Sequence, residues 1–332
     1  MKTSFRPVCC LVLTACGLLV GQQSSLQGPV AGFVFDSAAR VLRPIQGVPG
    51  ASLLGDPVNF GFALSAAYVS PRQDSAFVVG ADQSLHLFLL KTGTVTETGL
   101  GGLSGAPQAV VYSPSGTAVA LYAMGKARVL TGLPNAPTLV GTVNIPDSGQ
   151  RMAPAAGDGK VLALPANATL ALSDDGAYLL AVSEGSARLL GIHGDNRTLV
   201  PAHSNSLVAF AAGGHDVAVM DSVSGLTLIR DASGAAGQQV LATPDATLAG
   251  PVGLAFSRDE QTLYLASATA QSVVAFNLAA GSRSTIGCAC TPAALIPMGN
   301  VFRLNEVSPS PLWILDTGSS IPRTVFVPVR SE

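Results

Sequence analysis

Charged residues are scarce in this sequence. Only 11% of the 332 residues are Asp, Glu, Lys or Arg, and 18 basic against 20 acidic side chains give a formal net charge of −2. A nucleic-acid-binding surface needs clustered Lys and Arg to displace counterions from phosphates, and the basic residues here are spread thinly. We therefore expect no nucleic-acid partner.

Cysteine and helical periodicity are also scarce. Cys9, Cys10 and Cys16 lie near the N-terminus, which leaves Cys288 and Cys290 as structural thiols or a local disulfide. Two cysteines form no disulfide framework, so the hydrophobic core must stabilise the fold. No sustained 3.6-residue apolar period follows the N-terminal segment, whereas 36 Gly and 22 Pro are typical of a fold with many turns.

Metal-binding patterns are absent as well. The four histidines stand at no spacing that suggests converging ligands, and two neighbouring cysteines do not complete a zinc site. The D-x-D-x-D-G pattern of a calcium loop does not occur either. The sequence therefore predicts no metal and no cofactor.

The N-terminus has the order of a secretory signal. Lys2 and Arg6 precede an apolar run at 7–21, which is short for a membrane span and is followed by polar residues. We expect a signal peptide at 1–23 and one domain at 24–332. Cleavage near 21–23 would release a secreted or periplasmic protein. Alternatively, Leu13-Thr14-Ala15-Cys16 resembles a lipobox, and Cys16 would then carry the lipid of an envelope lipoprotein, the only membrane contact we expect. Fractionation of the wild type and Cys16→Ser separates the two routes.

A repeated unit fills most of the remaining chain. Residues 251–278 predict three short strands, at 252–256, 262–266 and 272–278, joined by polar turns. Similar strand–turn–strand units stand at 66–79, 109–122, 169–182, 207–220, 252–266 and 294–307. Most are spaced by roughly forty to forty-six residues, a period typical of four-stranded propeller blades. The one longer interval predicts a loop insertion near 145–165, and 47–60 is expected to be a loop.

The two chain ends extend this pattern. An N-terminal hairpin within 32–46 matches the pair of strands near the C-terminus, so we expect the ends to meet and close a ring without exposed edges. The sequence thus predicts an all-β fold, a β-propeller of antiparallel four-stranded blades. Seven blades are the first choice. Six is the alternative, since the N-terminal blade has no identifiable inner strands.

Several motifs resemble the YVTN-type and WD40-like propellers of secreted bacterial proteins. The resemblance rests on Thr262-Leu-Tyr-Leu-Ala-Ser followed by Ser272-Val-Val-Ala-Phe-Asn-Leu, and on the Ser-Pro-Ser-Gly and Ser-Asp-Asp-Gly turns at 113 and 173. The Trp-Asp and Gly-His pairs of true WD40 blades are missing. The resemblance implies a fold and leaves the activity open.

A binding role is the function that the sequence favours. Ligands of such rings are expected at the mouth of the central channel, on loops before the first strand and after the second strand of each blade. The polar residues expected there are Asp82, Lys126, Glu184, His203, Asp221 and Glu306. The predicted partner is a small ligand or a protein, and the protein is expected to be a monomer.

Two other functions compete with binding. A lactonase-like propeller hydrolase needs acid–base groups or a metal at the channel mouth, and the predicted inner strands carry no carboxylate, His or Arg. This lack makes catalysis the weaker expectation, and we expect no catalytic residues. The other alternative is a structural platform of the cell envelope, anchored through Cys16.

Overall fold

The computed structural model describes residues 28–91, 94–145, 170–183, 185–203, 205–307, 311–319 and 321–328. The expected signal peptide with Cys16, the candidate Glu184 and all of the expected insertion except Ile145 lie outside these residues.

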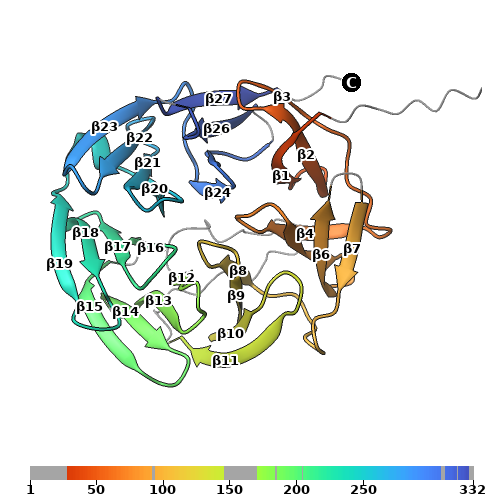
Figure 1. Cartoon of the computed structure of the whole chain (residues 1–332), viewed down its shortest axis with the longest axis horizontal. Coiled ribbons are helices and arrows are strands. Elements are labelled where there is room, and N and C mark those ends of the chain that lie inside the picture. Colours follow the sequence, from red (N-terminus) through yellow and green to blue (C-terminus); the bar gives the residue numbers. More distant parts are fainter. Residues whose placement is uncertain are drawn as a thin grey trace, which may run out of the picture.

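Seven antiparallel sheets stand around a ring (Figure 1). Six sheets have four strands each, in plain sequence order from the inside outwards, and the first sheet has three strands. The fold is a seven-bladed β-propeller, as predicted, and the six-bladed alternative is wrong.

Consecutive strands form each blade. Blade one contains β1 (Val30–Asp36), β2 (Val41–Val48) and β3 (Ala51–Leu54). Blade two contains β4 (Leu64–Val69), β5 (Ser75–Gly80), β6 (Leu85–Lys91) and β7 (Thr94–Thr98). Blade three contains β8 (Ala109–Tyr112), β9 (Ala118–Ala123), β10 (Lys126–Thr131) and β11 (Thr138–Asn144). Blade four contains β12 (Leu170–Leu172), β13 (Tyr178–Ser183), β14 (Ser186–Gly191) and β15 (Asn196–Pro201).

The remaining three blades follow the same order. Blade five contains β16 (Leu207–Phe210), β17 (Val217–Asp221), β18 (Gly225–Arg230) and β19 (Gly237–Ala242). Blade six contains β20 (Pro251–Phe256), β21 (Thr262–Ser267), β22 (Ser272–Asn277) and β23 (Ser282–Gly287). Blade seven contains β24 (Ile296–Met298), β25 (Val301–Arg303), β26 (Leu312–Asp316) and β27 (Arg323–Val327).

Buried apolar side chains form seven clusters within the described residues, one between each pair of neighbouring blades. The second strands show why their sequences are almost wholly apolar. On β9, Ala118 and Ala120 face blade four, whereas Val119 and Leu121 face blade two. Because successive side chains point to opposite faces and both faces are covered, apolar residues are favoured at nearly every position of such a strand.

Blade one lacks an innermost strand among the described residues. The start of β1 lies where second strands begin: the Phe33 amide donates to Gln73 Oε1 at 2.6 Å, and a Cβ on Gly32 would lie 3.0 Å from Met298. At the rim, β3 lies beside β27 and closes the ring (Figure 1). The N-terminal hairpin therefore supplies second and third strands, and β3 corrects the expectation of a loop at 47–60.

A hydrogen bond directly joins two turns of the blades that flank blade one. The Gly299 amide, in the turn between β24 and β25, donates to the Pro71 carbonyl, in the turn between β4 and β5, at 2.7 Å. Blades seven and two thus touch on the inner side of blade one.

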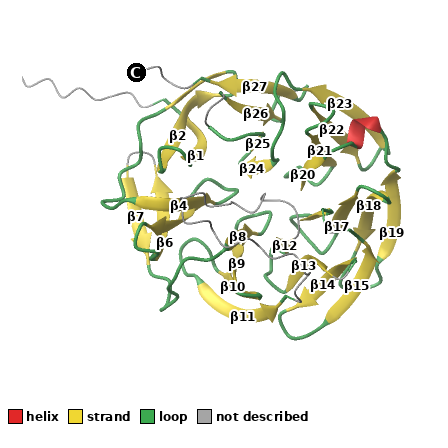
Figure 2. Ribbon diagram, turned by 180° about the vertical axis from the view of Figure 1, so that it is seen from behind, coloured by secondary structure: helices red, strands yellow, loops and turns green. Residues whose placement is uncertain are grey.

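Helix is confined to one short turn in the described part of the chain. This 3-10 turn, η1 (Ala246–Leu248), is capped by Asp245 and lies beside blade six (Figure 2). None of the described helices is long and apolar enough to span a bilayer. Cys288 and Cys290 are joined by a disulfide.

The strand order gives the ring two different faces. Turns between second and third strands, at 81–84, 124–125 and 222–224, lie on one face with the loops that lead into the innermost strands. We name it the 2–3 face. Turns between first and second strands, at 70–74, 113–117, 173–177 and 257–261, lie on the opposite face, the 1–2 face.

Candidate functional site

Five of the six binding residues predicted from the sequence are described, and all five lie on the 2–3 face. His203 stands in the loop before β16, and Asp221 ends β17. Asp82 and Glu306 lie in turns that follow second strands, and Lys126 opens the third strand β10. Their placement on these loops matches the expectation, and their role in binding remains a prediction.

The structure brings two of these residues together. His203 Nδ1 lies 2.9 Å from Asp221 Oδ2, and the His203 amide donates to the same oxygen at 2.8 Å. The Ser206 hydroxyl also donates to Oδ2, at 2.7 Å. The carboxylate of the second strand thus fixes the loop that leads into the innermost strand of the same blade.

Asp221 is buried and fully hydrogen-bonded. Its Oδ1 accepts from the amides of Val223 and Ser224 at 3.0 and 2.8 Å and from the Ser224 hydroxyl at 2.7 Å. The side chain is only 2% exposed. Burial acts to raise the pKa of this carboxyl, but the hydrogen bonds from His203, Ser206 and Ser224 outweigh burial and hold the pKa far below its usual value. The group is therefore ionised at neutral pH.

This carboxylate fixes the orientation of an exposed imidazole. The His203 side chain is 64% exposed although its Nδ1 is held by Asp221. With Nδ1 donating to Asp221, the neutral ring keeps Nε2 as an acceptor, and protonation turns Nε2 into a donor. The pair thus presents one oriented polar atom on the 2–3 face. Among the described residues, no three His, Cys, Asp or Glu side chains gather as metal ligands would.

The other predicted residues make separate local contacts. Asp82 accepts from the amide and hydroxyl of Ser84, and these hydrogen bonds lower its pKa. Glu306 accepts from Arg303 Nη1 at 3.2 Å; burial lowers the pKa of that guanidinium and Glu306 acts against the shift. Lys126 is exposed. None of these three has a described contact with His203 or Asp221.

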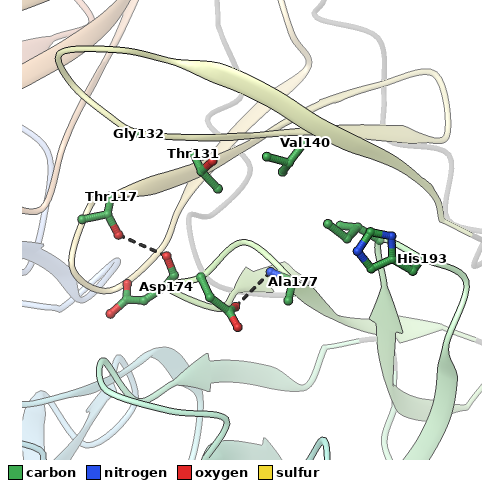
Figure 3. Close-up of a pocket in the computed structure, with 9 residues that line it drawn as sticks. Thr117, Thr131, Gly132, Val140, Asp174, Ala177 and His193 are labelled. Carbon is green, nitrogen blue, oxygen red and sulfur yellow. Dashed lines mark hydrogen bonds between the residues drawn. The ribbon is translucent and has the colours of Figure 1, made fainter.

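A cavity lies on the 1–2 face, which the sequence analysis did not select. It has a volume of about 520 Å³ and lies between blades three and four (Figure 3). Turns and strands of both blades line it with Thr117, Thr131, Gly132, Val140, Asp174, Asp175, Ala177, Ile192 and His193. Polar and apolar groups therefore share its walls.

The turn after β12 forms one wall of this cavity. Gly176 has a φ of +69°, and a Cβ there would lie 2.6 Å from Thr131 Cγ2, so only glycine lets this turn approach blade three so closely. Asp174 ties the same turn to blade three, because its Oδ1 accepts from the Ser115 amide and hydroxyl at 2.8 and 2.6 Å.

The sequence analysis placed a Ser-Asp-Asp-Gly turn at 173, which is correct, and found no ligand spacing for the histidines, among them His193. The cavity itself is made by turns that meet across two blades, and no spacing along the chain encodes that meeting. The sequence does show that this turn carries two acidic residues, Asp174 and Asp175, whereas the equivalent Ser-Pro-Ser-Gly turn of blade three carries no acidic residue.

Comparisons with known proteins agree on the fold. No family model and no curated protein matches the sequence. A functionally unknown protein from Desulfotomaculum acetoxidans DSM 771 has a similar structure, with a TM-score of 0.57 and 13% identity, over 89% of this chain and 95% of that one. A streptogramin B lyase matches with a TM-score of 0.53 and 12% identity, over 82% and 86%. At such identities the likeness concerns the fold alone: the chain is a seven-bladed β-propeller.

Proposed function

We propose that this protein is a non-catalytic binding propeller that acts outside the cytoplasm. Its small ligand or protein partner contacts the 2–3 face around His203 and Asp221. The proposal for the compartment rests on the basic, apolar and polar order of residues 1–23. Lipidation at Cys16 would hold the same module on the envelope, and cleavage near 21–23 would release it.

One observation carries the proposal for the site. A buried carboxylate with six hydrogen bonds holds an exposed imidazole in one orientation. Burying a charge is costly unless hydrogen bonds compensate for the lost water. The hydrogen bonds that compensate here also hold the loop before β16 in one conformation. A polar atom that is already oriented costs less entropy when a partner binds it.

Ligand-dependent thermal unfolding tests this function. The purified protein is heated with calcium, zinc, sugars, lactones and peptides, in the wild type and in His203→Ala. A ligand at a hundred times its Kd stabilises the folded state by about 2.7 kcal/mol, a readable shift in Tm. We expect a shift in the wild type that disappears in His203→Ala.

Arg258→Ala is the control, because Arg258 is exposed in the turn at 257–261 on the opposite face and does not line the cavity there. Its shift should equal that of the wild type. A shift that survives His203→Ala would contradict this site, and turnover of any lactone would contradict the non-catalytic role.

A further inference from the structure

The cavity on the 1–2 face keeps polar groups that no other described residue uses. Asp174 uses Oδ1 for Ser115, while its Oδ2 has no hydrogen-bond partner among the described residues. Within the same part of the chain, neither the Thr131 hydroxyl nor the His193 ring has a hydrogen-bond partner. One carboxylate oxygen, one hydroxyl and one imidazole of the lining are thus left for a ligand.

The charge of the lining is negative. Asp175 accepts from Ser173 and Ala177 through Oδ1 at 2.6 and 2.9 Å, and its Oδ2 lies 3.0 Å from His215 Nε2. Burial acts to raise the pKa of Asp175, but these hydrogen bonds outweigh it and the pKa lies below its usual value. Both carboxylates of the turn therefore favour a cation over an anion.

The opposite part of the lining is apolar. Val140, on β11, is 39% exposed, and Ile192 lies at the end of blade four's third strand. Gly141 brings the two blades together here, since a Cβ on it would lie 3.1 Å from Ile192 Cβ. Figure 3 shows Val140 across the cavity from the Asp174 turn. A ligand would therefore meet charge on one side and hydrocarbon on the other.

We propose that this cavity binds a small organic cation of the alkylammonium class. Its ammonium group lies beside Asp174, and its hydrocarbon part lies against Val140 and Ile192. An ammonium has three donors and no acceptor, which complements the unpaired carboxylate oxygen and the Thr131 hydroxyl. The volume of about 520 Å³ is within the range of small-molecule sites. This site is separate from the one around His203 and goes beyond the proposed function.

A set of three probes with one hydrocarbon chain tests the proposal. n-Hexylammonium, n-hexanol and n-hexanoate differ only in the head group, and their Kd values are measured by NMR titration of the purified protein. We expect n-hexylammonium to bind at least about tenfold more tightly than n-hexanol, because a hydrogen bond to a charged group is stronger than a neutral one. n-Hexanoate should not bind.

Two variants with matched chemistry locate the binding. Asp174→Asn keeps an oxygen that accepts from Ser115 but removes the charge, and we expect about tenfold weaker binding of n-hexylammonium. Glu260→Gln is the control, because Glu260 accepts from the Gly213 amide in a similar bond between neighbouring turns on the same face and does not line the cavity. Glu260→Gln and His203→Ala should bind as the wild type does.

Several results would overturn the proposal. Equal binding of n-hexanol and n-hexylammonium would show an apolar cavity only, and equal weakening in Asp174→Asn and Glu260→Gln would show unspecific attraction by surface charge. Absence of n-hexylammonium binding would also refute it. If Asp174→Asn does not fold, cross-peaks between the n-hexylammonium methylenes and the methyl groups of Val140 and Ile192 in the wild type decide the question.

Discussion

At the scale of single residues, the Asp221 carboxylate connects two segments of blade five through six hydrogen bonds. It is buried at the end of a second strand, where the equivalent positions of blades four and six are Ser183 and Ser267. Its two oxygens join the turn at 222–224 to the loop at His203. The carboxylate is therefore expected to stabilise the fold as well as to orient the imidazole.

Asp221→Asn should destabilise the protein at pH 7 by about 3 kcal/mol, because one amide NH2 would then face the donors on His203 and Ser206. The folded pKa of Asp221 lies below the unfolded value of about 3.9. Its stabilising effect is thus present above about pH 4 and is lost as the pH falls toward the folded pKa.

The measurement is the free energy of unfolding in urea as a function of pH. The difference between the wild type and Asp221→Asn should shrink below about pH 4. Asp56→Asn, at an exposed position, is the control and should change the free energy of unfolding by less than about 0.5 kcal/mol. A constant difference down to pH 2 would show that the charge of Asp221 is not the cause.

At the scale of elements, the turn between first and second strands has a repeated internal structure. The hydroxyls of Ser113, Ser173 and Ser257 accept from the amide five residues ahead at 3.1, 3.0 and 2.9 Å. Ser173 and Ser257 also donate to Asp175 and Asp259 two residues on. These serines recur because one small side chain can close the turn from inside as both acceptor and donor.

Ser173→Ala should therefore destabilise the protein by about 1–3 kcal/mol, since it leaves the Tyr178 amide without its serine partner and Asp175 without one donor. Chemical denaturation measures this effect. Ser284→Ala, on the exposed strand β23, is the control and should change stability by less than about 0.5 kcal/mol. Equal effects in the two variants would mean that the turn does not depend on the hydroxyl.

Elements with a strong local pattern could be predicted from the sequence. Apolar runs such as Thr262–Ser267 and the recurring Ser turns predicted strands, order and blade number. The short strand β3 was missed because Ala51–Leu54 stands among Gly and Pro and is fixed mainly by its pairing with β2. His203 and its loop could be found as well, but the bond to Asp221 joins residues 18 positions apart and depends on the folded loop.

At the scale of the whole molecule, no sheet of the described residues combines strands from the two ends of the chain: β1–β3 form one blade and β24–β27 another. The first and last blades meet through β3 and β27 and through a cluster of buried residues that includes Val34, Ile45 and Ile314. Every other pair of neighbouring blades is also joined by the chain itself. In the described residues, the seam between blades seven and one is formed by packing contacts and not by chain connection.

Hydrogen exchange should detect this seam. Amides of β1–β3 should exchange faster than those of β17 and β21, because blade one has three strands and no covalent link to blade seven. Mass spectrometry of peptides covering 30–54, 207–230 and 251–278 under native conditions gives the comparison. Slower or equal exchange in 30–54 would show that the seam is as stable as the other interfaces.

The bond between Gly299 and Pro71 constrains how the sequence can change. Other turns on the 1–2 face are also joined in pairs, by Asp174 to Ser115 and by Glu260 to Gly213, but those pairs belong to neighbouring blades. The Gly299–Pro71 bond joins turns of two blades that are not neighbours, so a longer turn in one blade would push the other away. An insertion at residue 71 or at residue 299 should therefore be tolerated poorly, because each turn limits the length of the other.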